Sequence, residues 1–374
     1  MPDALQTLAA QHDLQLPDAL HALLAAAPEG LDLGTVRLLG RDELASDALR
    51  AAPLSPALLP FAVGGETDAF AMFVPPEPGT RAQLVCAVSL QTGVYAPIAS
   101  DLRGFGAWLL LLRRAQAALP AGPGFAVTEL LNDTVGAART LAKALDLEPL
   151  ITAQVEPDPA HLATALLGCD RSSPWACSTL ARFEEDPKAA LKVLSPALSA
   201  ASFSTGLLEQ AGDLLLTAGE TKRAVSSIAS GLSRLEPGLQ AAPYKLDEPD
   251  EETGSLFEPL YVGAAFRFLQ EHVKDVTPQV KQSAVWSFLE QSMGPGFGCS
   301  VKLEPAAVID YARKRAFAGD PPGGRWALHL AFGELFGDPD ARRAIAEELV
   351  SAWKLAGRPW YASRFEQIAR APAR

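Results

Sequence analysis

The sequence predicts an α+β fold, in which a small antiparallel sheet with flanking helices at the N-terminus precedes an all-α region of helical hairpins. Two observations predict it. Residues 59–74 place two apolar segments on either side of a Gly-Gly-Glu-Thr-Asp turn, and Gly64 and Gly65 tolerate the positive φ that a tight reversal requires. From about residue 160 onward, apolar residues recur at helical spacing.

The second strand of the predicted hairpin carries large side chains on both faces, because Phe70 and Met72 alternate with Phe73. A helix must therefore cover at least one face of the sheet. Helix candidates lie within residues 16–27 and 103–118. Asp101 is positioned to cap the second of these helices.

The N-terminal domain is expected to span residues 1–120. Its predicted elements follow in chain order: two short helices within residues 4–27, a strand at 33–39, a helical turn or two at 41–50, the hairpin at 59–74, strands at 84–90 and 94–98, and a helix at 103–118.

Several short motifs of this domain occur together. The opening helix reads Leu-Pro-x-x-x-x-x-Leu-Leu from Leu16 to Leu24, a Leu-Pro-Phe-Ala strand leads into the Gly-rich turn, and the closing helix carries Phe105 and Trp108. Over residues 14–115 the chain resembles the SUKH superfamily, which includes the Smi/Knr cell-wall regulators and many bacterial immunity proteins. One departure is that Glu66 and Thr67 intervene before the Asp of the turn. The resemblance implies an immunity or regulatory protein that docks a toxin domain or another protein partner.

A helical connector is expected over residues 121–160 and a helical, repeat-like domain over 161–374. Small and apolar residues recur 34 positions apart. Within residues 205–238, the positions of Gly212, Gly219, Ala224 and Ile228 relative to one another are close to those within a single repeat of this length. That segment is similar to a tetratricopeptide repeat, which implies paired antiparallel helices in close contact. Further helices are expected at residues 260–273, 280–293, 305–318, 326–336, 339–355 and 359–371, with sharp turns at 321–324 and 337–339.

Composition excludes some classes of function. The net charge of −12 is spread evenly, and the 374-residue chain has no basic stripe, which argues against nucleic-acid binding but suits a basic protein partner. The apolar run at residues 107–112 is far too short to span a bilayer, and no basic, apolar leader opens the chain. We therefore expect a cytoplasmic protein without membrane contact.

The chain contains no recognisable catalytic motif, so we expect no enzyme activity, catalytic residues or cofactor. His161, Cys169 and Cys177 fall eight residues apart, but this spacing is too wide for a typical zinc site, and no metal is expected. The C-terminal aromatic residues are expected to fill gaps between helices or, alternatively, to line an exposed groove; they are Trp326, Trp353, Trp360 and Tyr361.

A partner-binding surface is predicted at the turn that carries Glu66 and Asp68, with Asp101 as its neighbour. The alternative interpretation of these carboxylates is turn and cap chemistry. The preferred function is therefore a non-catalytic module that docks a partner protein, such as a basic toxin domain. The alternatives are a helical scaffold that binds a peptide through its C-terminal repeats, and an enzyme whose catalytic residues are dispersed. The oligomeric state stays open.

Overall fold

The computed structural model describes residues 4–34, 36–45, 55–64, 68–77, 82–90, 95–118, 134–233, 268–269, 271–272, 274–282, 286–287, 304–334 and 338–370. Two compact units contain these residues. The first unit holds the described residues within 1–54 and 58–202, and the second holds 55–57 and the described residues from 203 onward. The predicted α+β architecture is confirmed.

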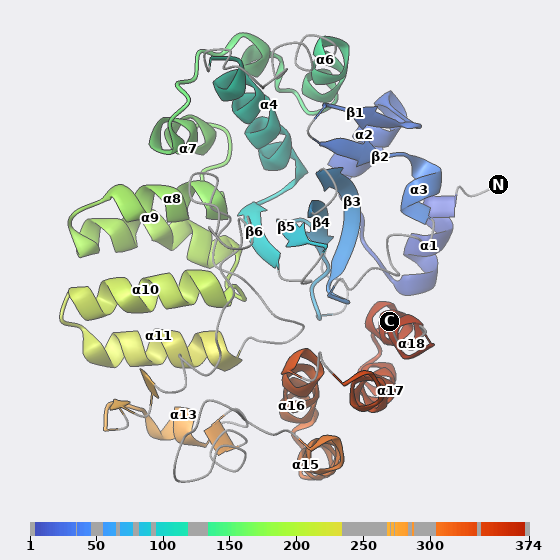
Figure 1. The fold of residues 1–374 in the computed structure, drawn as a ribbon, viewed down its shortest axis with the longest axis vertical. Coiled ribbons are helices and arrows are strands. Elements are labelled where there is room, and N and C mark those ends of the chain that lie inside the picture. Colours follow the sequence, from blue (N-terminus) through green and yellow to red (C-terminus); the bar gives the residue numbers. More distant parts are fainter. Residues whose placement is uncertain are drawn as a thin grey trace. The chain divides into compact units, whose positions relative to one another are not determined.

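The sheet of the first unit is a six-stranded antiparallel meander, in which every strand pairs with its neighbours in the chain (Figure 1). Its strands are β1 (Gly30–Asp32), β2 (Arg37–Leu39), β3 (Leu58–Gly64), β4 (Asp68–Phe73), β5 (Val85–Ser89) and β6 (Tyr95–Ala99). The predicted central hairpin is β3–β4, with Gly64 opposite Asp68 and Leu58 opposite Phe73. The register shifts around Phe61, which lies in a bulge.

The strand predicted at residues 33–39 is instead the second half of a hairpin. β1 precedes it, and the reversal occurs at Gly34, whose φ is +87°. The backbone N–H of Gly34 donates to Oδ1 of Asp32 at 2.8 Å, an Asx turn. A single strand cannot continue through this left-handed residue, so the strand within the predicted range begins only at Arg37.

Both predicted helices cover the sheet. The rings of Phe61 and Phe105 meet edge to face with centroids 5.2 Å apart, and Phe70 lies 5.8 Å from Trp108, so α4 (Leu102–Ala118) packs on β3 and β4. The buried leucines of α2 (Asp18–Ala26) line a narrow apolar pocket together with Phe61 and residues of β1 and β2. The other helices that the structure describes before residue 158 are α1 (Ala4–His12), α3 (Arg41–Ala45), α6 (Val135–Ala144) and the 3₁₀ helix η1 (Glu148–Thr152).

Three helices beyond residue 158 belong to the first unit, namely α7 (Pro159–Leu167), α8 (Pro174–Phe183) and α9 (Pro187–Ala200). This differs from the predicted boundary at residue 160, because α7 contacts α4 and α8 contacts β6. The hydroxyl of Ser173, at the N-cap of α8, donates to the carbonyl of Ile98 at 2.8 Å. The edge strand β6 is thereby covered by a helix.

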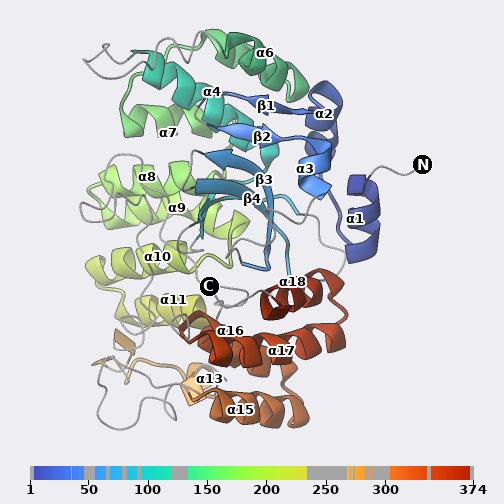
Figure 2. The ribbon, with the colours of Figure 1, turned by 45° about the vertical axis from the view of Figure 1, so that its right-hand side comes forward.

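The described part of the second unit consists mainly of helical hairpins (Figure 2). They are α10 (Thr205–Thr217) with α11 (Thr221–Ser233), α15 (Pro305–Phe317) with α16 (Pro321–Glu334), and α17 (Pro339–Leu355) with α18 (Pro359–Arg370). The short helix α13 (Pro278–Lys281) overlaps the helix predicted at 280–293, most of which lies outside the described residues.

All three hairpins turn in the same way. The first helix ends before an Ala-Gly pair whose glycine has a positive φ: Gly219 at +76°, Gly319 at +88° and Gly357 at +68°. The residue after each glycine donates its backbone N–H to the carbonyl five residues earlier, for example Asp320 to Arg315 at 2.9 Å. This is the Schellman motif, and only glycine adopts its left-handed conformation without strain.

Glycine also lets the paired helices approach closely, as the repeat pattern predicted. A Cβ on Gly212 of α10 would meet Ile228 of α11 at 2.7 Å, and one on Gly324 of α16 would lie 2.6 Å from the carbonyl oxygen of Ala312 in α15. The predicted sharp turn at residues 321–324 is wrong, because these residues form the first turn of α16. Prolines fit the first turn of a helix, and Oδ1 of Asp320 accepts from the N–H of Gly323 at 3.1 Å.

Among the described residues, no helix is both long enough and apolar enough to cross a membrane.

Candidate functional site

Of the predicted partner-binding residues, the structure describes Asp68 and Asp101, and these two are not neighbours. Glu66 lies outside the described residues. Asp68 pairs with Ser89 at one end of β5, whereas Ala99, two residues before Asp101, pairs with Val85 at the other end. Four residues of a strand span about 13 Å, so Asp68 and Asp101 are not neighbours as predicted.

Asp101 caps α4, as its alternative interpretation proposed. Its Oδ1 accepts from the N–H of Gly104 at 2.7 Å, and its backbone carbonyl accepts from Phe105 at 3.0 Å. Both groups are among the helix N–H donors that would otherwise lack a partner. The carboxylate of Asp101 is therefore used by the fold, although its side chain is exposed.

A buried carboxylate lies next to this cap. Asp170, in the connection between α7 and α8, accepts from the backbone N–H of Ser100 at 2.9 Å, from its hydroxyl at 2.7 Å and from the N–H of Ser172 at 3.2 Å. Burial raises the pKa of Asp170, its hydrogen bonds from Ser100 lower it, and the nearby Asp101 raises it. A Cβ at Gly104 would lie 2.3 Å from Oδ2, so this glycine makes room for the carboxylate.

All three described hydrogen bonds to Asp170 come from the fold's own backbone and a serine. The cluster joins the connection between α7 and α8 to the end of β6, and no imidazole is among the described hydrogen-bond donors to Asp170. Its chemistry is that of a structural link. No local pattern in the sequence indicates it, because Ser100 and Asp170 are 70 residues apart.

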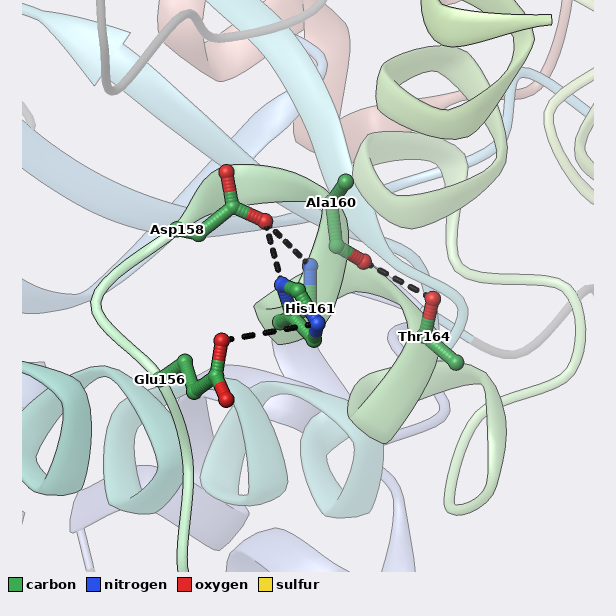
Figure 3. Close-up of polar contacts among 5 residues, drawn as sticks. All are labelled: Glu156, Asp158, Ala160, His161 and Thr164. Atoms are coloured by element: carbon green, nitrogen blue, oxygen red, sulfur yellow. Dashed lines mark hydrogen bonds and ion pairs between the residues drawn. The ribbon is translucent and has the colours of Figure 1, made fainter.

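A second polar cluster lies on the surface at the start of α7 (Figure 3). Nδ1 of His161 lies 2.7 Å from Oδ2 of Asp158, which also accepts from the backbone N–H of His161 at 2.9 Å. Nε2 lies 3.5 Å from Glu156. The hydrogen bond that its ring makes to the carboxylate of Asp158 and the charge of Glu156 raise the pKa of His161. The hydrogen bonds from the backbone N–H and the ring of His161 lower the pKa of Asp158.

This surface cluster is a helix cap with a paired imidazole. All three side chains are largely exposed, so solvent screens their attraction. Of the two cysteines spaced eight residues apart after His161, Cys177 is buried, and burial raises its pKa to about 11. Within the described residues, no group of three or more His, Cys, Asp or Glu side chains is arranged to hold a metal ion.

The C-terminal aromatic residues are core. Trp326, Trp353, Trp360 and Tyr361 are all at most 2% exposed, which agrees with the prediction that they fill gaps between helices. Trp353 stacks on Tyr361 with centroids 4.3 Å apart, and its Nε1–H donates to Nε2 of His329 at 3.1 Å. Trp360 donates to the carbonyl of Pro56 at 2.6 Å, which ties residues 55–57 to α18.

His329 lies inside this core, with 5% of its surface exposed. Burial first, and the charge of Arg325 second, lower the pKa of His329 to about 3. The imidazole is therefore neutral at physiological pH and accepts the hydrogen bond of Trp353.

Exposed apolar side chains identify a different kind of surface. In the described part of the chain, three large hydrophobic side chains are exposed: Phe183, Phe317 and Leu355, at 55%, 97% and 91%. Each is the last residue of the first helix of a hairpin, namely α8, α15 and α17. The equivalent residue of α10 is Thr217, whose hydroxyl donates to the carbonyl of Asp213 at 2.9 Å.

This position has no part in closing the turn. In a Schellman motif the accompanying apolar contact joins the third-last helical residue to the residue after the glycine, not the last residue. Thr217 shows that a polar residue is accommodated there. Sequence reasoning missed these residues because helix ends and apolar faces cannot be separated by periodicity alone.

Compared with protein-family models, curated protein sequences and solved structures, the chain has no match.

Proposed function

We propose that this chain is a non-catalytic protein-binding module of the immunity or regulatory kind, which docks a basic protein partner such as a toxin domain. The observation that carries the proposal is the repeated exposure of a large apolar residue at the end of the first helix of a hairpin. Single exposed apolar residues are ordinary on protein surfaces, but Phe317 and Leu355 occupy the same position in two matching turns, and Phe183 likewise ends the first helix of a hairpin.

Phe183 is the member of this set that suits a basic partner. It ends α8 and is followed by Glu184 and Glu185, both exposed. Asp186 is occupied, because it caps α9 by accepting from Lys188 and Ala189. An aromatic anchor beside two solvated carboxylates matches an apolar socket with a basic rim.

The charge of the whole chain supports the same partner. A net charge of −12 raises the rate of encounter with a basic protein, and added salt weakens this effect. The SUKH resemblance of residues 14–115 adds the expectation that the partner is a toxin or a regulated protein. α8 belongs to the same compact unit as the sheet that carries the resemblance.

The experiment is capture of partners by the full-length chain from native lysate, identification of those that bind, and titration of the purified partner. We expect a basic protein whose affinity falls roughly tenfold for Phe183→Thr and for Glu184→Lys with Glu185→Lys. Glu77→Lys, which reverses an exposed charge in the loop after β4, is the matched control. Full affinity in the Phe183 and Glu184/Glu185 variants would contradict the proposal.

The helical scaffold stays a second candidate, because α15 and α17 begin 34 residues apart and each ends in a turn of the same type. This is the period of a tetratricopeptide array, whose helices bind extended peptides. A partner that ignores the Phe183 and Glu184/Glu185 substitutions, yet is displaced by a peptide from its own sequence, would favour the scaffold.

A further inference from the structure

Phe317 and Leu355 lie on one face of the second unit. α15 and α17 are in contact and run side by side in the same direction (Figure 2). Arg313 of α15 donates from Nε and Nη2 to the two carboxylate oxygens of Glu348 in α17, at 2.9 and 2.7 Å. Phe317 follows Arg313 by four residues and Leu355 follows Glu348 by seven, and both intervals return to the same helix face.

The ion pair joins the two helices, and the exposed side chains of Phe317 and Leu355 both lie beyond it at the C-terminal ends of α15 and α17. Packed helices lie about 8–10 Å apart, so one partner surface can contact both side chains. We call Phe317, Leu355, Arg313, Lys314 and Glu348 the α15–α17 face. Nothing in the geometry of the turns requires apolar residues on it, as Thr217 shows at the equivalent position.

The charge on this part of the chain differs from the remainder. Residues 304–370 contain ten basic and nine acidic residues, a net charge of +1, in a chain of net charge −12. Exposed cations and anions alternate on the face: Lys314 pairs with Asp310 at 2.6 Å, and Arg313 pairs with Glu348. Lys354, next to Leu355, pairs with Glu366.

A surface that binds its own copy must be self-complementary. In a dimer with a two-fold axis, a patch on one copy faces the same patch on the second copy. A patch that carries charges of one sign is therefore repelled by its counterpart. The remainder of the chain carries a net −13 and disfavours self-association, whereas the α15–α17 face holds both signs beside two apolar anchors.

We infer that the α15–α17 face is a homodimer interface, in which Phe317 and Leu355 of one copy pack against the same face of a second copy. The exposed ion pairs at its rim exchange partners or remain beside those of the other copy. Two anchors per copy without a wide interface give a weak dimer, with dissociation in the micromolar range. This interface uses Phe317 and Leu355, whereas the proposed partner surface uses Phe183, so the two proposals are tested with different variants.

The test is sedimentation velocity of the full-length chain over about 1–200 µM, a range that brackets micromolar dissociation. We expect reversible dimerisation that strengthens when salt is raised, because screening weakens the repulsion between two acidic chains. Phe317→Thr and Leu355→Thr should each raise the dissociation constant about tenfold, and the double variant about a hundredfold or more. The threonines copy Thr217, so the hairpins should keep their thermal unfolding temperature and helical circular dichroism.

Phe183→Thr is the matched control, because it removes an exposed aromatic residue from the end of another hairpin. Its dimerisation should equal that of the wild type. A wild-type chain that stays monomeric throughout, or a folded double variant that dimerises normally, would overturn the inference. Equal weakening by Phe183→Thr would also overturn it, since association would then be non-specific. A monomeric chain that loses a heterologous partner on Phe317→Thr would assign the face to that partner instead.

Discussion

The two units hold their helices in place by different means. In the first unit a buried carboxylate, Asp170, joins the α7–α8 connection to the end of the sheet through three hydrogen bonds. In the second unit glycines bring helix backbones into contact, and a neutral histidine completes an aromatic core. The hydrogen bonds of Asp170 join residues that are far apart in the chain. The glycine and histidine contacts of the second unit join residues within one or two neighbouring hairpins.

This difference explains why the domain boundary was harder to predict than the hairpins. A link between Ser100 and Asp170 crosses 70 residues and leaves no local pattern. Close helix pairing instead leaves small residues at fixed spacing, which a single sequence displays. The comparison also predicts that the two units respond to different perturbations.

The largest effect is expected at Asp170. Asp170→Ala leaves the N–H and hydroxyl of Ser100 and the N–H of Ser172 without this acceptor, and buried unsatisfied donors cost about 1–3 kcal/mol each. We expect a loss of about 3 kcal/mol in the free energy of unfolding, measured by urea denaturation followed by circular dichroism.

Asp101→Ala is the control, because it removes a neighbouring but exposed cap, for which about 1 kcal/mol is expected. Equal losses for the two variants would mean that the buried link contributes no more than an ordinary helix cap. The contrast between the units would then disappear.

The next effect is the response of the second unit to acid. His329 has a pKa of about 3 in the folded chain, below its ordinary value of about 6.5. Below pH 6.5 the unfolded chain binds a proton that the folded chain does not. Stability is therefore unaffected above this pH and falls as pH decreases toward 3, by up to about 1.4 kcal/mol per pH unit.

His329→Gln tests this acid sensitivity, since the amide oxygen can accept from Trp353 but does not titrate in this range. Between pH 6.5 and 5 the wild type should lose about 2 kcal/mol more than the variant. His161→Ala should leave the slope close to that of the wild type, because its side chain is exposed. Parallel stability curves for the wild type and His329→Gln would refute the role of the buried imidazole.

Much of the fold was predictable from the sequence because its signals are local. The β3–β4 hairpin follows from its glycines and flanking apolar runs, and the cap at Asp101 from its place before an apolar helix. Of the β1–β2 hairpin only β2 was predicted, within a strand at residues 33–39, because the three-residue strands are too short to show alternation. The start of α16 was misplaced because Pro and Gly favour both turns and first helical turns.

The candidate sites were less predictable. Acidic residues near turns are common, and Asp101 proved to be a cap, while Glu66 lies outside the described residues. Exposure of Phe183, Phe317 and Leu355 depends on which helix face packs on which neighbour, and this is decided by tertiary contacts. The turns that follow Phe317 and Leu355 are alike, whereas the turn after Phe183 has no left-handed glycine, so position in the turn alone does not predict exposure.

A smaller loss is expected where helix backbones touch. Gly324→Ala places a Cβ 2.6 Å from the carbonyl oxygen of Ala312, so α15 and α16 must separate. Overpacking costs about 1–3 kcal/mol, and the higher helix propensity of alanine returns up to about 1 kcal/mol. We expect a net loss of about 1–2 kcal/mol in thermal or urea unfolding, and a gain would show that the two helices are not in tight contact.

The smallest effect has the opposite sign and completes the comparison. Gly136 lies in the first turn of α6, in the first unit, and a Cβ there would meet no atom within 4 Å. Gly136→Ala should therefore stabilise the chain by about 0.5 kcal/mol, through helix propensity and a less flexible unfolded state. Urea denaturation of both glycine variants on one day resolves the sign. If Gly136→Ala destabilises as much as Gly324→Ala, the loss at Gly324 cannot be assigned to close contact between α15 and α16. Close backbone contact would then not be a feature that separates the second unit from the first.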